Sequence, residues 1–297
     1  MRYPGDSVVS ETAVSENAAL AAIARTVAEE AAEHVRSRRT ELFAPTGTRA
    51  ADASVSSKST PTDPVTVADT ETETLIRDLL RRERPGDEIL GEEAGGSVAV
   101  PNGVRWVVDP IDGTVNFLYG IPAYAVSVAA QIDGHSVAGA VVDVARSVTY
   151  WAASGQGAWA SGLAPDVVRL TCNPIADPEL ALVATGFAYS RERRVQQGAL
   201  MAQLLPHVRD IRRVGAAALD LCMVASGAVD AHIEHGLSPW DWAAGGLIAA
   251  EAGAHVVLPP ADSRSGEGHA TIAAAPGIAE AFLTTLTEIG GLEAMPD

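Results

Sequence analysis

The chain has 297 residues, of which 47% are hydrophobic and 20% are charged, which is the composition of an ordinary globular protein. Its formal net charge of −17 disfavours nucleic acid and anionic membranes as main partners, because binding to phosphate-rich surfaces requires a basic protein face. No signal-like N-terminus, no apolar run of membrane-spanning length and only two cysteines together predict a cytoplasmic protein without a disulfide framework.

The first half of the chain predicts two helices followed by strands. Apolar residues at helical spacing over 15–35 predict a long amphipathic helix, and the Ser/Thr/Ala/Pro-rich stretch 44–61 predicts a loop. After a short extended piece at 63–66, a second helix is predicted to start with a capping box at 70–73 and to end at 85–86. Strands separated by Gly-containing turns, predicted to form an antiparallel sheet, are 104–108, 123–132, 137–144 and 148–152.

The second half alternates strands and helices. Short strands are predicted at 180–185, 210–214, 229–234, 255–258 and 271–275. Helices are predicted near 192–205, 216–226, 240–252 and 277–289. We therefore expect an α/β (α+β) fold of layered sheets and helices, with an α+β subdomain at 1–165 and an α/β subdomain at 166–297 that act as one unit.

Carboxylates are concentrated in short segments where loops are predicted. These segments contain Asp63 with Asp69, Glu92-Glu93, Asp109 with Asp112, and Asp241. Within Asp109-Pro-Ile-Asp-Gly-Thr114, two carboxylates and the Ile111 carbonyl can converge, and hard cations such as Mg²⁺ prefer these oxygen ligands. Gly113 permits a tight turn, and N–H groups at a helix starting with Thr114 would suit phosphate oxygens. Bound cations would also let a chain of charge −17 accept a phosphate.

Each of these segments also has an ordinary structural explanation. Asp-Pro and Asp-Gly are common turn formers, and Glu92-Glu93 taken alone fits a solvated loop. Asp241, between two tryptophans, fits a helix N-cap. None of the segments decides between these roles by itself.

Four segments match the motifs of one enzyme family in type and in order. The matching stretches are Lys58–Asp69, Gly91-Glu92-Glu93, Trp106–Phe117 (WVVDPIDGTVNF) and Pro239–Gly245 (PWDWAAG) continuing to Gly253. This pattern resembles the inositol monophosphatase family, in particular its actinobacterial members, over nearly the whole chain to about residue 290. The resemblance implies a five-layered αβαβα sandwich of the metal-dependent sugar phosphatase type, with the metal loops in the N-terminal subdomain.

The resemblance also implies a catalytic metal site with two or three Mg²⁺ ions. The implied ligands are Glu92, Asp109, the Ile111 carbonyl and Asp112 for the first ion, and Asp109, Asp112 and Asp241 for the second, with a third, weaker ion near Glu92. Glu92 and Thr114 would position and deprotonate the attacking water. Asp69 would accept a hydrogen bond from the Thr114 hydroxyl.

For the substrate, the resemblance implies contacts from the metal loop and from the second half of the chain. The implied substrate-binding residues are Gly113, Thr114, Gly215, Ala216, Ala217, Glu234 and Asp241. The Gly113 and Thr114 N–H groups would hold the phosphate, while Glu234 and the 215–217 backbone would meet the polyol hydroxyls. Ala216 stands where many family members carry Ser or Thr, so one hydroxyl beside the polyol is missing. Phe187, Tyr189 and His235 are further candidates for the alcohol pocket.

The expected activity is Mg²⁺-dependent hydrolysis of myo-inositol monophosphates, with wider sugar-phosphate activity, inhibition by Li⁺ and a homodimeric assembly. Fructose-1,6-bisphosphatase, histidinol-phosphate phosphatase and 3′-phosphoadenosine phosphatase share the metal loops, although Glu234 favours a polyol over a nucleotide. An alternative of another class is a regulatory role with transcription machinery or RNA. The intact acidic set favours the enzyme, and a NAD enzyme is disfavoured because no GxGxxG follows a strand.

Overall fold

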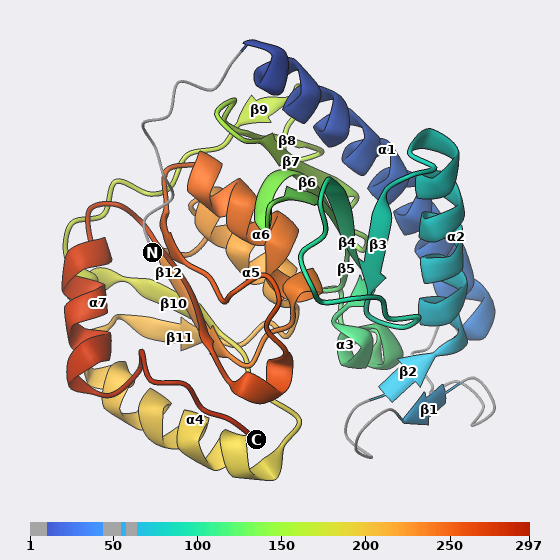
Figure 1. Ribbon diagram of the computed structural model, residues 1–297. Helices are drawn as coiled ribbons and strands as arrows, with labels where there is room; N and C mark the ends of the chain where they lie inside the picture. The colour runs from blue at the N-terminus through green and yellow to red at the C-terminus, as the bar shows by residue number, and fades with distance from the viewer. Residues whose placement is uncertain (1–10, 44–54, 58–63) are drawn as a thin grey trace.

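The computed structural model describes residues 11–43, 55–57 and 64–297, and two β-sheets alternate with layers of helices in it (Figure 1). Helices α1 (Glu11–Leu42) and α2 (Val67–Glu83) cover the outer face of a seven-stranded sheet. The middle layer contains α5 (Ala217–Ala225) and α6 (Pro239–Glu251). Helices α4 (Arg191–Leu204) and α7 (Ala279–Glu288) cover the outer face of a five-stranded sheet. The predicted αβαβα order is confirmed.

The seven-stranded sheet is mixed rather than purely antiparallel. Its order is β3 (Glu88–Gly91), β4 (Val104–Asp112), β5 (Ala125–Ile132), β6 (His135–Asp143), β7 (Val148–Ala153), β8 (Ala158–Ser161) and β9 (Val168–Arg169). Strand β3, which the sequence did not predict, runs parallel to β4, and all other neighbouring pairs are antiparallel. The strand is short and only its last two residues are buried, so it shows no clear alternation.

The five-stranded sheet contains the strands predicted for the second half of the chain. Its order is β11 (Asp210–Arg212), β10 (Leu182–Thr185), β12 (Ala231–His235), β14 (Ala270–Ala274) and β13 (His255–Val257). Strand β10 is parallel to β11 and β12, whereas β14 is antiparallel to β12 and β13. The predicted division at residues 165–166 falls between β8 and β9, so the last strand of the seven-stranded sheet lies beyond it. The division stays a prediction, and one apolar cluster joins both halves.

Two predictions near the start of α2 are wrong in detail. Within the predicted loop at 44–61, β1 (Val55–Ser57) pairs through its backbone with β2 (Pro64–Thr66), while the other loop residues lie outside the described part of the chain. The capping box is formed by Thr66 and Asp69 rather than at 70–73, because Thr66 has the extended backbone that an N-cap requires. Helix α2 therefore begins at Val67, and Asp69 lies in its first turn.

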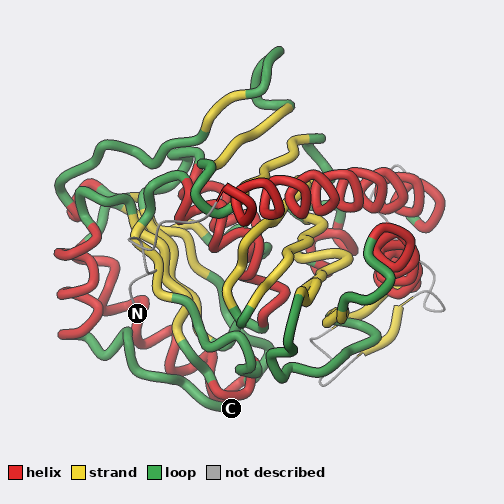
Figure 2. Tube along the Cα trace, turned by 45° about the horizontal axis from the view of Figure 1, so that its top comes forward, coloured by secondary structure: helices red, strands yellow, loops and turns green. Residues whose placement is uncertain are grey.

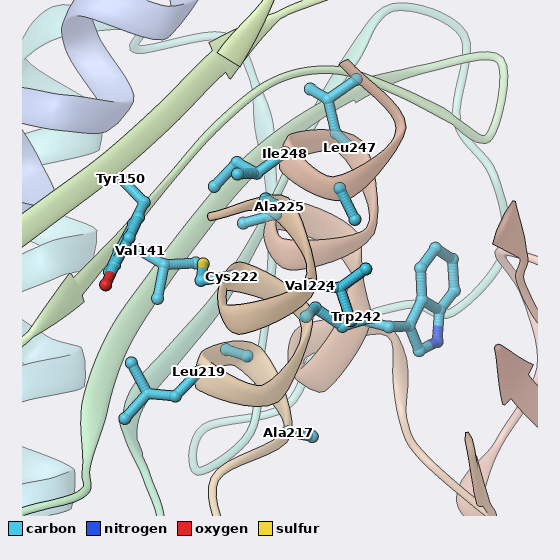
Figure 3. Close-up of a cluster of buried hydrophobic side chains, with 14 of the residues drawn as sticks. Val141, Tyr150, Ala217, Leu219, Cys222, Val224, Ala225, Trp242, Leu247 and Ile248 are labelled. Atoms are coloured by element: carbon cyan, nitrogen blue, oxygen red, sulfur yellow. The ribbon is translucent and has the colours of Figure 1, made fainter. Parts of the chain in front are cut away.

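Small aliphatic side chains allow the layers to approach closely. Figure 2 shows α1 lying across the strands of the seven-stranded sheet with α2 beside it. In the middle layer, a Cβ at Gly139 of β6 would lie only 3.0 Å from the Cα of Ala244 in α6. Val141, Tyr150 and Trp242 all belong to the apolar cluster between the two sheets (Figure 3). Close packing of this kind holds the strand and helix ends in fixed positions.

Shorter elements complete the described chain. They are α3 (Thr114–Tyr119) and the 3₁₀ turns η2 (Pro178–Leu180), η3 (Leu205–His207) and η4 (Ser265–Glu267). Cys172 and Cys222 are both free thiols. Among the described residues, none of the helices combines the length and the apolar content that crossing a lipid bilayer requires.

Candidate active site

Two carboxylates at the end of β4 meet a third from a distant part of the chain. Asp109, Asp112 and Asp241 each place one carboxylate oxygen within 4.8 Å of the others. The pairing of β4 with β5 is regular up to Asp109 and shifts between Asp109 and Asp112. Pro110 lies in this irregular stretch and has no N–H for the ladder, which favours a bulge there. The bulge turns both carboxylates of one strand toward Asp241 of α6.

The turn after β4 has a geometry that its residue types explain. The Ile111 N–H donates to Asp109 Oδ1 at 3.0 Å, which holds the first carboxylate against the turn. Gly113 has a φ of 92°, and a Cβ there would lie 2.9 Å from the Ala123 carbonyl oxygen. A side chain at this position is therefore excluded by both strain and space. Helix α3 starts directly after it, at the predicted Thr114.

Backbone groups of the middle helices orient the other two carboxylates. The Ala217 and Ala218 N–H groups, at the start of α5, donate to Asp112 Oδ1 at 3.2 Å and to Oδ2 at 2.7 Å. The Ala217 N–H is therefore already paired with Asp112, and the polyol contact predicted for the 215–217 backbone stays a prediction. Asp241 accepts the Ser238 N–H at 2.7 Å within a capping box, so it helps to start α6 and also faces the cluster.

Asp69 and Thr114 are in contact, as predicted. The Thr114 hydroxyl lies 3.1 Å from Asp69 Oδ1 and 3.1 Å from the Ile111 carbonyl oxygen. The other oxygen of Asp69 accepts the Thr66 N–H at 2.9 Å. Both Asp69 and Thr114 are buried, so this contact ties the start of α2 to the start of α3 behind the metal loop.

Glu92 follows β3 and lies beside the cluster. Its N–H donates to the Val108 carbonyl at 3.3 Å, one residue before Asp109. The Glu92 carboxylate contributes to the raised pKa of Asp109 through its charge and a side-chain hydrogen bond, after the larger effect of burial. The structure thus places Glu92 next to Asp109, as the family pattern implies.

The electrostatics of the cluster fit a bound cation. Burial is the first cause that raises the pKa of Asp109, of Asp241 and of Asp112, the last to about 7, and the charge of Glu92 adds to it in all three. Buried carboxylates that repel each other in this way are stable as anions only beside positive charge. Their hard oxygen donors suit Mg²⁺ better than softer metals. The residues present therefore fit the metal that the sequence implies.

These groups line one pocket of about 900 Å³ between the two halves of the chain. The predicted site residues on its wall are Glu92, Asp109, Ile111, Asp112, Gly113, Thr114, Gly215, Ala216, Ala217, Glu234 and Asp241, together with Phe187, Tyr189 and His235. Burial raises the pKa of Glu234 to about 8, and the charge of Asp112 adds to this. Asp63, and Lys58 at the start of the matching stretch, lie outside the described residues.

Arg213 is a pocket residue that the sequence reasoning missed. It lines the pocket, is exposed, and its positive charge acts to lower the pKa of Asp112 and of Glu234 against the effect of burial. Its position two residues before Gly215, a predicted substrate contact, is the feature of the sequence that could have identified it. Such a cation can contact an anionic substrate group at the mouth of an acidic site.

Comparison with known proteins agrees with this geometry. The sequence profile of the inositol monophosphatase family matches residues 16–290. The chain belongs to the inositol monophosphatase family. It is 56% identical to the inositol-1-monophosphatase of Mycobacterium leprae over 282 residues, which cover 94% of this chain and 97% of that protein. The solved structure of Mycobacterium tuberculosis SuhB matches with a TM-score of 0.78 and 48% identity, covering 93% of this chain and 98% of that one.

A more distant relative has a different name. The Nus factor SuhB of Pasteurella multocida is 36% identical over 229 residues, covering 75% of this chain and 82% of that protein. The family is one of metal-dependent phosphatases, which agrees with the acidic cluster at the end of β4.

Proposed function

We propose that the chain is a Mg²⁺-dependent phosphomonoester hydrolase that acts on myo-inositol monophosphates and, more weakly, on other sugar phosphates. The observation that carries this proposal is the meeting of the buried Asp109 and Asp112 with the half-buried Asp241 within 4.8 Å, on the wall of a pocket that also contains the start of α3. Three carboxylates that converge in a pocket have a chemical use when they hold hard cations against a phosphate.

Each ion in this proposal has its own set of ligands. The first Mg²⁺ would be held by Glu92, Asp109, the Ile111 carbonyl and Asp112, the second by Asp109, Asp112 and Asp241, and a third, weaker one near Glu92. When bound, the ions supply positive charge that stabilises the attacking and departing oxygens of the phosphoryl transfer. The hydrogen bonds from Ala217 and Ala218 hold Asp112 in place for this role.

The chain's own residues orient and deprotonate the water. The Thr114 hydroxyl has one hydrogen, so it donates either to Asp69 or to the Ile111 carbonyl at a given moment. When it donates to Asp69, its oxygen can accept a hydrogen bond from the attacking water. The Glu92 carboxylate then takes a proton from this water as its oxygen bonds to phosphorus. The P–O bond to the polyol breaks, and the departing polyol oxygen takes a proton from solvent water. Because phosphoryl transfer needs mainly positioning and charge stabilisation, no covalent phosphoenzyme is required.

The substrate is held from two sides in this proposal. The N–H groups of Gly113 and Thr114 hold the phosphate where α3 begins. On the opposite wall, Glu234 and the backbone from Gly215 to Ala217 meet the hydroxyls of the polyol. A carboxyl group suits hydroxyl donors and does not provide the stacking surface that a nucleotide base requires.

The test is phosphate release from a panel of inositol, sugar, histidinol and nucleotide monophosphates, with fructose 1,6-bisphosphate added, each with Mg²⁺ and with a chelator. We expect inositol monophosphates to give the highest kcat/KM, turnover to require Mg²⁺, and Li⁺ to inhibit. A clearly higher kcat/KM for histidinol phosphate or fructose 1,6-bisphosphate would assign the chain to a sibling activity. No Mg²⁺-dependent release from any member would reject the proposal.

A second, regulatory role with transcription machinery is a separate proposal, favoured by the relative named Nus factor SuhB. The net charge of −17 argues that direct RNA binding is not its basis. Pull-down with Asp109→Asn tests it, because lost phosphatase activity with retained binding of a transcription protein would separate the two roles. We also propose a cytoplasmic homodimer, which fractionation and light scattering of the purified chain would test.

A further inference from the structure

The loop that carries Glu92 is fixed to α2 by hydrogen bonds to Glu73 and Arg77, which form an ion pair with each other on that helix. The loop is closed at its base by the Gly91 N–H, which donates to the Gly95 carbonyl at 3.1 Å. Directly after Glu92, the Glu93 N–H and the Ala94 N–H both donate to the carboxylate of Glu73, at 2.6 Å and 3.0 Å. Glu92, the proposed metal ligand and general base, is therefore held in place through the N–H groups of the two residues that follow it.

Glu73 reaches this loop from the middle of α2 and is 1% exposed. Its carboxylate lies so close to the backbone of Gly91 that a Cβ there would overlap it. A glycine immediately before Glu92 is thus needed for the carboxylate to reach the two N–H groups. A buried carboxylate with this many backbone donors fixes a loop more firmly than a solvated contact does.

Arg77 completes the arrangement one helical turn further along α2. Its Nε donates to Glu73 Oε1 at 2.7 Å, and its Nη2 donates to the Gly95 carbonyl at 2.5 Å. A third, longer bond runs from Nη1 to the Ile89 carbonyl of β3 at 3.4 Å. The guanidinium thereby neutralises Glu73 and contacts the backbone on both sides of the loop.

The same face of α2 also holds the other half of the water-activating pair. Asp69, Glu73 and Arg77 are spaced four residues apart, so they lie along one face of the helix. Asp69 contacts the Thr114 hydroxyl, while Glu73 and Arg77 hold the loop of Glu92. A single rigid helix therefore sets the distance between the two groups that act on the water.

We infer that Glu73 and Arg77 are positioning residues that place Glu92 for metal binding and for proton transfer. The inference rests on the proposed Mg²⁺-dependent function and adds to it a pair of residues that touch neither substrate nor metal. In Glu73→Gln the amide nitrogen must face one of the N–H donors, so the loop loses at least one of its anchors. The Glu92 side chain is then held less firmly beside Asp109.

The experiment measures the Mg²⁺-induced rise in Tm across a Mg²⁺ titration, alongside kcat and KM. For Glu73→Gln we expect the apparent Mg²⁺ dissociation constant to rise about tenfold and kcat to fall about tenfold, as for other residues that orient metal ligands. The KM for the inositol phosphate at saturating Mg²⁺ should stay unchanged, because Glu73 is remote from the polyol side. Glu83→Gln, the same change at an exposed position of α2, is the matched control and should alter none of these values.

A second experiment, in a protein that already lacks the Glu92 carboxylate, distinguishes a positioning role of Glu73 from a general effect on stability. In a Glu92→Gln protein, adding Glu73→Gln should not weaken Mg²⁺ binding further, because the group that Glu73 positions is already removed. Arg77→Lys keeps the positive charge but loses the planar guanidinium that donates to several acceptors at once. We expect its apparent Mg²⁺ dissociation constant to rise about threefold. If Glu73→Gln does not fold, Arg77→Lys is used to test the inference instead.

The outcomes distinguish this inference from the proposed function. A wild type that responds to Mg²⁺ together with a Glu73→Gln variant that responds equally would overturn the inference alone. An equal loss from Glu73→Gln in the wild-type and Glu92→Gln backgrounds would also overturn it, since that is the result of a purely structural role. A wild type without any Mg²⁺-induced shift would overturn the proposed metal site and the inference with it.

Discussion

Replacing Asp112 by Asn removes one negative charge from the carboxylate cluster while leaving the side-chain size unchanged. Burial is the main cause that raises the pKa of Asp112 from 3.8 to about 7, and the N–H groups of Ala218 and Ala217 counteract it only in part. Each pKa unit corresponds to about 1.4 kcal/mol. Keeping this carboxylate ionised at pH 8 therefore costs the metal-free fold about 4 kcal/mol.

The substitution also has a structural cost. In Asp112→Asn the side chain keeps one oxygen for the Ala218 N–H, at 2.7 Å in the structure, but its amide nitrogen then faces the Ala217 N–H. An unsatisfied buried donor costs about 1–3 kcal/mol. At pH 8 the metal-free variant should thus be more stable than the wild type by about 1–3 kcal/mol, which raises Tm by a few degrees. At pH 5 the folded wild type holds Asp112 protonated, so this advantage disappears.

The assay combines thermal unfolding at pH 5 and pH 8, in chelator and in Mg²⁺, with phosphate release. Mg²⁺ should raise the Tm of the wild type but not of Asp112→Asn, and turnover should fall by at least about a thousandfold because a ligand proposed for both ions is lost. Asp78→Asn, on the exposed side of α2, is the control and should behave as wild type. Wild-type-like turnover, or a metal-free variant at pH 8 no more stable than wild type, would falsify this reasoning.

Three further predictions concern the rest of the site. Thr114→Val and Asp69→Asn should each lower kcat about a hundredfold, and the double variant should lose little more; additive losses would contradict a shared role in aiming the water. Arg213→Gln should raise KM for inositol phosphate about tenfold with kcat largely retained, and an unchanged KM would exclude a substrate contact. Because the folded pKa values of Asp112 (about 7) and Glu234 (about 8) exceed the unfolded values of 3.8 and 4.5, their contribution to metal-free stability is fully present below about pH 4, declines as the pH rises, and is lost once the pH has passed about 7 and 8. Thermal unfolding in chelator should show this decline, and a Tm that rises over that range would contradict it.

Much of the architecture could be predicted because it depends on local patterns. Helix α1 and the alternating elements of the second half follow from periodicity, and Gly113 follows from a turn that only glycine adopts. The errors were local as well. Thr66 and Asp69 form the capping box four residues before the predicted one, because the backbone of Thr66 is extended whereas Thr70 lies inside the helix.

The sequence by itself located the acidic loop, because Asp109, Ile111 and Asp112 are near neighbours at one strand end, and the order of the family motifs along the chain predicted a metal role for it. Only the tertiary structure decided how this loop is completed. The packing of α5 and α6 between the sheets brings in Asp241 and the N–H groups that hold Asp112, and the packing of α2 brings in Glu73. Such contacts join residues far apart in the chain, so they depend on how whole layers stack rather than on neighbouring residue types.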